Sequence, residues 1–266
     1  MHFKKWDQDF VQDIIGMIKK LKNKIKRLVD TRVKLLKNQQ RLNEQTHFNY
    51  NQISQLFKEE SFIPFSAWAM SPSTILHVLN DISINKRKVV IEFGAGASTF
   101  YIAKLLKVLK VDAVFYSVES DAIWVSELRR QLEIYNLQDY VKIIHAPLVE
   151  IEKDFSYKDQ KVWYDIAVLE KVFQDVSKID LILVDGPFGG STPFARYSAY
   201  PFLQSKLAEN ISIYLDDIKR PHEREIAESW QNNLNGHLRF IERYAVLTNN
   251  RKGFDVTPFQ LEDLPL

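Results

Sequence analysis

The chain has no cysteine, and this absence removes several kinds of chemistry at once. Disulfide bonds, thiolate nucleophiles and cysteine-ligated zinc sites are all excluded. Long apolar runs are missing as well, since no stretch approaches the ~20 consecutive apolar residues that cross a bilayer. The N-terminus carries charges from Lys4 onward and no apolar segment ending in small residues, so it does not resemble a secretory signal. We therefore expect a cytoplasmic protein.

The chain has little net charge as a whole, but its charge is unevenly distributed. All 266 residues together sum to +2, whereas residues 1–42 carry twelve Lys or Arg against four Asp, a net charge of +8. The remainder of the chain is therefore at −6. An anionic partner would be attracted to the N-terminal segment and not to the rest of the molecule.

Residues 1–46 are expected to form a basic helical arm. Their apolar positions alternate spacings of three and four residues, which is the heptad pattern of a coiled coil. The pattern runs through Val11, Ile14, Ile18, Leu21, Ile25 and Leu28, and then Arg32, Leu35, Gln39 and Leu42.

Three partners can be considered for this arm. We expect it to pack on its own domain or to join copies of the chain into a homo-oligomer. The alternative is peripheral attachment to the inner face of an anionic membrane, because Lys and Arg flank the apolar stripe. Nucleic acid is disfavoured, since the arm has few aromatic residues that could stack on bases.

Residues 47–84 are expected to be a junction followed by a lead-in helix, Ser73–Leu79. Ser71 and Pro72 mark its start, because a hydroxyl can cap a helix and proline is favoured at the first helical position. Residues 85–266 then alternate β-rich runs with helical patterns, which predicts a Rossmann-like, doubly wound and mostly parallel sheet.

The elements of this α/β domain can be assigned by residue range. Five strands are expected at Val89–Phe93, Ala113–Val118, Val141–Ile144, Leu181–Val184 and Ile211–Leu215. Four helices are expected at Ser98–Lys107, Asp121–Tyr135, Pro193–Ala208 and Pro221–Asn232. Two last strands, about Leu238–Leu247 and Gly253–Phe259, should form an antiparallel hairpin. The connection between the third and fourth strands is not assigned.

A glycine-rich turn joins the first strand to the first helix of the domain. Gly94 and Gly96 would let the backbone pass close to a ligand, where a Cβ would obstruct it. Thr99 stands where a dinucleotide fingerprint has its third glycine, and no lysine follows as in a phosphate-binding P-loop. The second strand ends at Glu119, whose carboxylate could accept both ribose hydroxyls of an adenosyl ligand. Trp124 could lie near the adenine or simply pack in the core.

Three carboxylates follow the fourth and fifth strands. Asp185, Asp216 and Asp217 lie just past the carboxyl ends of these strands, where doubly wound sheets bind their ligands. Without Lys or Arg between them they would repel one another unless a hard cation such as Mg²⁺ were bound. The alternative is structural: Asp217 caps the next helix and Asp216 pairs with Arg220.

Several short motifs occur together and in one order. They are Trp68-Ala69-Met70-Ser71-Pro72, His145-Ala146-Pro147-Leu148, Trp163-Tyr164-Asp165, Val184-Asp185-Gly186-Pro187, Ala195-Arg196-Tyr197 and Leu215-Asp216-Asp217-x-x-Arg220-x-x-Glu223. From Phe62 onward the chain thereby resembles a family of bacterial class I methyltransferases that use S-adenosylmethionine (SAM). Members of that family are often encoded beside polysaccharide and glycosyltransferase genes.

The resemblance implies roles for many of these residues. The cofactor would be held by Glu92, Gly94, Ala95, Gly96, Ser98, Glu119, Ser120, Trp124, Ala146 and Pro147, with Glu92 organising the site for its amino-acid end. Asp185 would be catalytic, and His145 either a general base or a positioning residue along the adenine. The acceptor would meet Trp68, Arg196, Tyr197 and Arg220. A metal on Asp185, Asp216 and Asp217 would resemble that of catechol O-methyltransferases, although Asp217 stands where those enzymes have Asn.

The sequence therefore predicts a SAM-dependent O-methyltransferase acting on a small or carbohydrate-like acceptor, with Mg²⁺ as a possible second cofactor. Two other functions stay open. An NAD-dependent oxidoreductase is disfavoured by Thr99, which stands where its fingerprint has a third glycine. A non-catalytic coiled-coil scaffold is disfavoured because it would need none of the residues Glu92, Gly94, Gly96, Glu119 and Asp185.

Overall fold

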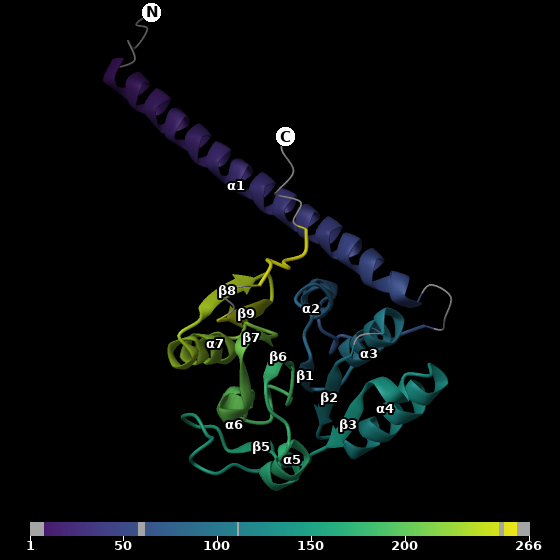
Figure 1. The fold of residues 1–266 in the computed structure, drawn as a ribbon. Coiled ribbons are helices and arrows are strands. Elements are labelled where there is room, and N and C mark those ends of the chain that lie inside the picture. The colour runs from purple at the N-terminus through teal and green to yellow at the C-terminus, as the bar shows by residue number, and fades with distance from the viewer. Residues whose placement is uncertain (1–7, 58–61, 111, 250–252, 260–266) are drawn as a thin grey trace, which may run out of the picture. The chain divides into compact units, whose positions relative to one another are not determined.

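The computed structural model describes residues 8–57, 62–110, 112–249 and 253–259. Figure 1 shows the order of its helices and strands. The chain divides into two compact units, one of Met1–Phe48 with Gln260–Leu266 and the other of Asn49–Phe259.

A single helix, α1 (Gln8–Ser54), accounts for the described part of the first unit and continues into the second. It has 47 residues and runs on through the segment where a junction was expected, ending in the short 3₁₀ helix η1 (Gln55–Phe57). Its last two turns place Asn49 and Ile53 in the buried interior of the second unit, where Asn49 Nδ2 donates to Ser73 Oγ at 2.7 Å. Among the described residues, no helix is long and apolar enough to cross a membrane.

The lead-in helix α2 (Pro72–Ile84) begins where the sequence predicts and is longer than expected. Ser71 Oγ accepts a hydrogen bond from Thr74 N–H at 3.1 Å, and Pro72 occupies the first helical position. This cap satisfies one of the backbone N–H groups that every helix start leaves without an intrahelical partner.

The second unit is built on a seven-stranded sheet, which confirms the Rossmann-like fold. Its strand order is β3-β2-β1-β6-β7-β9-β8; the first five strands in that order run parallel, and β9 and β8 are antiparallel. The strands are β1 (Val89–Phe93), β2 (Val114–Glu119), β3 (Lys142–His145), β6 (Ile179–Val184), β7 (Leu207–Leu215), β8 (His237–Ile241) and β9 (Tyr244–Thr248).

Helices cover both faces of this sheet, because neighbouring residues of a strand point to opposite sides. Val90 of β1 belongs to a core cluster shared with α2, α3 and α4, whereas Ile91 belongs to a second cluster shared with α5, α6 and α7. The helices are α3 (Ala97–Leu109), α4 (Ala122–Ile134), α5 (Ile166–Phe173), α6 (Ala199–Leu203) and α7 (Pro221–Leu234), with 3₁₀ turns η2 (Gln138–Tyr140) and η3 (Gln204–Lys206).

The segment that the sequence left unassigned contains a small hairpin and a helix. Strands β4 (Leu148–Glu150) and β5 (Val162–Tyr164) pair with each other in a separate two-stranded sheet, and α5 follows.

Two assignments made from the sequence are wrong. The range Pro193–Ala208 is not one helix: α6 and η3 together occupy only half of it, Phe194 has a left-handed φ of 54°, and β7 already begins at Leu207. The C-terminal hairpin lies within the range expected to be one strand, since Ile241 pairs with Tyr244 across a turn at Glu242 and Arg243. In the described part of 253–259 there is no strand. The turn lacks Gly and Asn, the usual hairpin signals.

The sheet brings four strand ends to the same level. Phe93 of β1 is in register with Val118 of β2 and Val184 of β6, and Val184 is in register with Leu215 of β7. Beyond them come Gly94, Glu119, Asp185 and Asp216. The chain order reverses between β1 and β6, and ligands of such sheets bind in the crevice at this point.

Candidate active site

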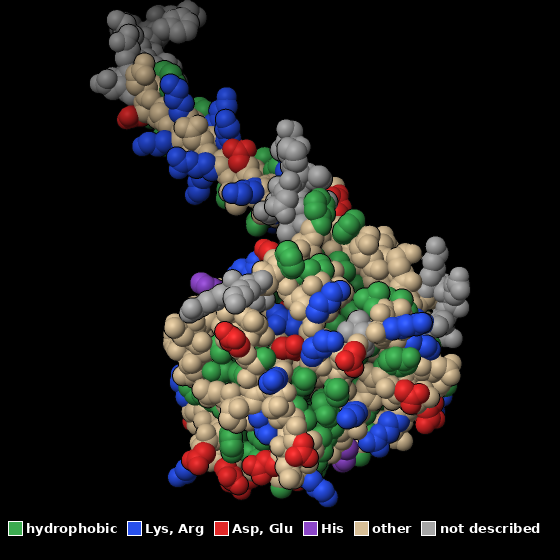
Figure 2. Space-filling view, viewed as in Figure 1, with side chains coloured by type: hydrophobic (Ala, Val, Ile, Leu, Met, Phe, Trp, Pro, Cys, Tyr) green, Lys and Arg blue, Asp and Glu red, His purple; other side chains and the backbone are tan. Residues whose placement is uncertain are grey.

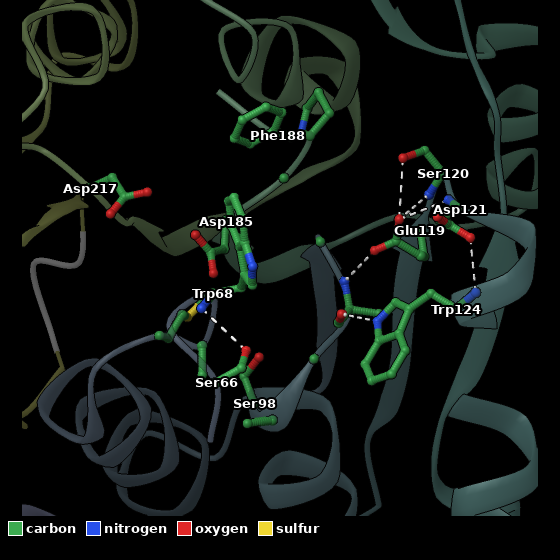
Figure 3. Close-up of a pocket in the computed structure, with 18 of the residues that line it drawn as sticks. Ser66, Trp68, Ser98, Glu119, Ser120, Asp121, Trp124, Asp185, Phe188 and Asp217 are labelled. Carbon is green, nitrogen blue, oxygen red and sulfur yellow. Dashed lines mark hydrogen bonds between the residues drawn. The ribbon is translucent and has the colours of Figure 1, made fainter. Parts of the chain in front are cut away.

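A cavity of about 870 Å³ opens at these four strand ends. In Figure 3, Glu119, Ser120, Asp121 and Trp124 gather on one side of it, and Asp185 and Asp217 lie on the other. Of the residues predicted to bind a ligand, those that line the cavity are Trp68, Gly94, Ala95, Gly96, Ser98, Glu119, Ser120, Trp124, Asp185, Arg196, Asp217 and Arg220.

The two glycines of the turn after β1 differ in whether the protein itself could accommodate a side chain at their positions. Gly94 has φ +93°, and a Cβ on it would lie 2.6 Å from the backbone nitrogen of Gly186, so packing within the protein requires it. Gly96 has an extended φ of −168°, and a Cβ there would meet no protein atom within 4 Å. Nothing in the protein requires glycine at position 96, whereas a ligand lying against the start of α3 would.

Glu92 lies beneath this turn and does not line the cavity. It is fully buried and accepts hydrogen bonds from the hydroxyls of Ser98, Thr99 (2.6 Å) and Ser117 (2.5 Å), the last being its register partner on β2. Burial raises the pKa of Glu92 to about 7, although the three hydroxyls act in the opposite direction. Thr99 Oγ1 also accepts from Gly96 N–H at 2.9 Å, which explains a hydroxyl where dinucleotide fingerprints have glycine.

Glu119 closes the turn from the β2 side. Its Oε1 accepts from the backbone N–H of Ser120 (2.6 Å) and Asp121 (2.9 Å), and its Oε2 accepts from Ala95 N–H at 3.3 Å. Trp124 Nε1 donates to Ala95 carbonyl oxygen at 2.8 Å, so Ala95 is held from both sides (Figure 3). Among the described residues Oε2 accepts a single hydrogen bond, which leaves it able to accept a ligand hydroxyl.

The three aspartates converge as the sequence predicts, with one oxygen of each within 4.8 Å of the others. The premise that no arginine lies between them is wrong. Arg196 Nη2 lies 3.1 Å from both Asp185 Oδ1 and Asp217 Oδ2, and Arg243 Nη2 lies 2.7 Å from Asp216 Oδ2 and 2.8 Å from Asp217 Oδ1.

The structural alternative for these aspartates also needs correction. Arg220 pairs with Asp217 at 3.1 Å and not with Asp216, and the residue at the N-cap position of α7 is Arg220 itself. Asp216 is fully buried and has Arg243 as its cationic partner.

This set of residues fits a Mg²⁺ site poorly. Magnesium prefers an octahedral shell of carboxylate and water oxygens. Here every carboxylate already has a guanidinium within 3.1 Å, and a dication would have to approach three positive groups. The arginines supply the positive charge that the sequence analysis expected a metal ion to supply.

Asp185 and Asp217 both line the cavity, with side chains 15% and 16% exposed. Both oxygens of Asp217 are paired with arginines, whereas within the described residues Asp185 has an ion pair at Oδ1 only, so its Oδ2 can accept from a ligand. Burial raises the pKa of Asp185 well above its usual range, an effect that Arg196 opposes and the two other aspartates reinforce. A carboxylate with a raised pKa is a stronger proton acceptor than an ordinary aspartate.

Arg196 is held inside the protein and offers little to a substrate. It is 3% exposed, its Nη1 donates to Asp216 carbonyl oxygen at 3.1 Å, and its Nη2 binds the two aspartates named above. Its neighbour Tyr197 stacks on Tyr157, with ring centroids 4.4 Å apart, and is not part of the cavity lining.

The motif after β3 lies beside the cavity, outside its lining. His145 Nε2 is 3.2 Å from Ser120 carbonyl oxygen, and Ala146 N–H donates to Glu119 carbonyl oxygen at 2.9 Å. The Pro147 carbonyl accepts from Asp165 N–H at 2.8 Å. The contacts of His145 and Ala146 support the end of β2 at Glu119 and Ser120, and that of Pro147 joins the motif to the start of α5.

Two exposed aromatic rings meet over the cavity. Trp68, from the segment before α2, is 73% exposed, and Phe188, from the loop after β6, is 57% exposed. Their ring centroids are 5.3 Å apart in an edge-to-face arrangement, and both rings line the cavity. They add an apolar wall to the side that carries Asp185.

Among the lining residues that the sequence did not predict are three with large side chains, Tyr164, Phe188 and Arg243. Phe188 lies between glycines in the segment Gly186–Gly190, where an apolar ring has no local partner, and this could have been noticed. Arg243 carried no local signal, because its turn was not recognised as a turn.

No protein-family model and no curated protein sequence matches the chain. Solved structures with a similar fold include an O-methyltransferase from Bacillus cereus in complex with S-adenosylhomocysteine (14% identity, TM-score 0.49, 79% of this chain and 90% of that chain). Another is the O-methyltransferase TomG from Streptomyces achromogenes in complex with SAM (12% identity, TM-score 0.49, 75% and 88%). Similarity at this level does not assign an activity, so the chemistry must follow from the site.

Replacing the two glycines should separate folding from ligand binding. Gly94→Ala should lower the free energy of unfolding by about 1–3 kcal/mol or more, because it strains a left-handed residue against Gly186. Gly96→Ser keeps a favoured helix cap and should change stability by less than about 1 kcal/mol, yet weaken cofactor binding at least tenfold. Urea unfolding measures the stability, and calorimetric titration with S-adenosylhomocysteine measures the binding. Equal loss of stability in both variants would contradict the view that the fold needs glycine at position 94 but not at 96.

The buried carboxyl of Glu92 should make the protein less stable as pH rises. Its folded pKa of about 7 exceeds the ordinary glutamate value of 4.5, so its contribution to the free energy of unfolding is complete below pH 4.5 and is lost towards pH 7. Glu92→Gln should therefore flatten the fall in unfolding free energy between pH 5 and pH 8 by about 2–3 kcal/mol. Glu133→Gln, on the exposed side of α4, is the control, and parallel profiles for wild type and Glu92→Gln would refute the prediction.

Removing Arg243 should destabilise the protein, because it leaves the aspartate cluster with less positive charge beside it. Arg243→Met leaves the buried Asp216 without its cation and should cost about 3 kcal/mol at pH 8, with a smaller loss at pH 5 where protonation relieves the charge. Arg239 lies in the same hairpin, on β8, and pairs with the exposed Asp255 beyond it. Arg239→Met should therefore cost less than about 1 kcal/mol. Both free energies of unfolding are measured by chemical denaturation. Similar losses in the two variants would show that the destabilisation does not come from the unpaired aspartates.

Proposed function

We propose that the chain is a SAM-dependent methyltransferase that methylates an oxygen of a small or carbohydrate-like acceptor. The observation that carries the proposal is the turn after β1, where the protein itself needs glycine at position 94 but not at 96. An open space against Gly96, beside a carboxylate with an acceptor position to spare, supports an adenosyl ligand at this point.

The cofactor would occupy the side of the cavity between the start of α3 and the end of β2. Glu119 Oε2 would accept a ribose hydroxyl, and Trp124 would form the wall beside the ring system. Ser98, bound to the buried Glu92, and the backbone of Ala95 and Gly96 would face the rest of the molecule. When bound, SAM supplies an electrophilic methyl group on a positively charged sulfur.

The acceptor would occupy the other side, between the aromatic rings and the aspartate cluster. Trp68 and Phe188 would contact its apolar face, and Asp185 would take the proton that the attacking hydroxyl loses. Arg196 would act as a positioning residue, because its bond to Asp185 holds one carboxylate oxygen and leaves the other to the acceptor. His145 would support Ser120 from outside the cavity.

No divalent metal is part of this proposal. The arginines supply the positive charge around the aspartates, and Asp185 alone provides the proton acceptor. Addition of Mg²⁺ or EDTA should therefore leave both cofactor binding and turnover unchanged.

The two other functions are less well supported. An acid at the end of β2 would also suit NAD, but Thr99 serves as a hydroxyl link between Glu92 and Gly96 where NAD enzymes have glycine. A scaffold without a ligand would be expected to fill the cavity with side chains, whereas about 870 Å³ is open.

Calorimetric titration with S-adenosylhomocysteine tests the cofactor. We expect micromolar binding that falls at least tenfold in Glu119→Ala and is unchanged in Glu170→Ala, an exposed acid on α5. NAD should give no heat of binding. Absence of binding in protein that mass spectrometry shows to be free of bound cofactor would overturn the proposal.

The proton acceptor is tested by turnover. With glycan and phenol acceptors screened for S-adenosylhomocysteine release, Asp185→Asn should lower kcat by about 10²–10⁴-fold, the usual contribution of a general base. Its affinity for S-adenosylhomocysteine should stay within threefold of wild type. A variant that keeps its kcat would remove Asp185 from the reaction.

A further inference from the structure

The described part of α1 carries an exposed apolar surface that the proposed methyl transfer does not use. Twelve large apolar side chains between residues 11 and 36 are 36–63% exposed. They are Val11, Ile14, Ile15, Met17, Ile18, Leu21, Ile25, Leu28, Val29, Val33, Leu35 and Leu36. An isolated helix in water would not be expected to keep so many apolar side chains exposed, so this surface calls for a partner.

The apolar and the basic side chains lie on opposite faces of the helix. At 100° per residue, the twelve apolar side chains fall within an arc of about 160°. The opposite arc carries most of the positive charge, at Lys19, Lys20, Lys26, Arg27, Lys34 and Lys37. Figure 2 shows Lys and Arg side chains spread along the length of this helix. The region is therefore amphipathic over about 40 Å.

A second copy of the chain is a poor partner for this surface. In a two-stranded coiled coil the positions beside the apolar seam carry charges of both signs that pair between chains. Here none of those positions is acidic: apart from Thr31 they are apolar, as at Ile15 and Val29, or basic, as at Lys22 and Lys24. Residues 11–37 contain nine Lys or Arg and two Asp, so association would also bring like charges together.

An anionic lipid surface accommodates each of these features. A wide apolar face can enter the boundary between headgroups and acyl chains, while Lys and Arg on the other face stay in water near the lipid phosphates. Arg32, which interrupts the apolar face, can reach the headgroups because its long side chain lets the guanidinium leave the apolar layer.

We propose that residues 11–37 of α1 bind to membranes rich in anionic lipid, with the helix axis parallel to the membrane surface. Binding requires both faces: the apolar side chains provide insertion, and the basic ones provide the preference for negative headgroups. The helix lies along the surface and does not cross it, since its basic face runs along its whole length.

Co-sedimentation of the full chain with vesicles tests this directly. Vesicles of phosphatidylcholine with about one third phosphatidylglycerol should bind the chain at least tenfold more tightly than phosphatidylcholine alone, and 0.5 M NaCl should weaken binding at least fivefold. Ile18→Ser with Leu21→Ser should reduce binding at least tenfold. Gln12→Ser with Asn23→Ser, which adds the same number of serines to the polar face, should bind like wild type.

A second measurement distinguishes lipid from a second copy. Sedimentation equilibrium of wild type and of the Ile18→Ser, Leu21→Ser variant gives the mass in solution, and thermal unfolding shows that the second unit stays folded in both. Failure to bind anionic vesicles, or equal binding to both vesicle types, would overturn the proposal. An oligomer that the variant dissociates, in a chain that binds no vesicles, would assign the apolar face to self-association.

Discussion

The structure depends on a close backbone contact between the loops that follow β1 and β6. Gly94 and Gly186 meet there so tightly that a Cβ on either would lie within 3 Å of the backbone of the other. The carbonyl of Phe93 accepts from both Asp185 N–H (2.8 Å) and Gly186 N–H (2.7 Å), so the two loops are fixed to one another. Because this is the point where the strand order reverses, the contact decides where the cavity opens and where Asp185 stands in it.

Next to this contact, arginine side chains offset the mutual repulsion of three aspartates. Asp185, Asp216 and Asp217 end two neighbouring strands and would repel one another in a partly buried site. Arg196 and Arg243, from two different loops, enter between them and bind three aspartates with two guanidinium groups. Such a network holds its members in place, and of the two aspartates that line the cavity it pairs both oxygens of Asp217 but only Oδ1 of Asp185. The same cluster thereby connects loop geometry to the proposed chemistry.

The two sides of the cavity differ in how rigidly they are built. Glu92, Glu119 and Trp124 fix the turn after β1 through hydrogen bonds to hydroxyls and backbone groups. On the other side, Trp68 and Phe188 are more than half exposed and contact each other through their rings. Under the proposed function this difference would suit a cofactor held in a fixed site and an acceptor that enters and leaves past side chains that can move.

The sequence by itself determined the features that depend on local order. Apolar runs and their spacing predicted the five parallel strands, Ser71 and Pro72 predicted the start of α2, and the turn after β1 marked the cavity. These predictions succeed because the apolar pattern of a strand, a helix cap and a glycine turn depend on neighbours only a few residues away. Tertiary structure alone decided how the charges are balanced. Arg243 lies in a two-residue turn without the usual hairpin residues, and the antiparallel pairing of β9 with β7 carries it to Asp216, 27 residues earlier in the chain. No local pattern records such a contact, because it depends on where the strands lie relative to one another.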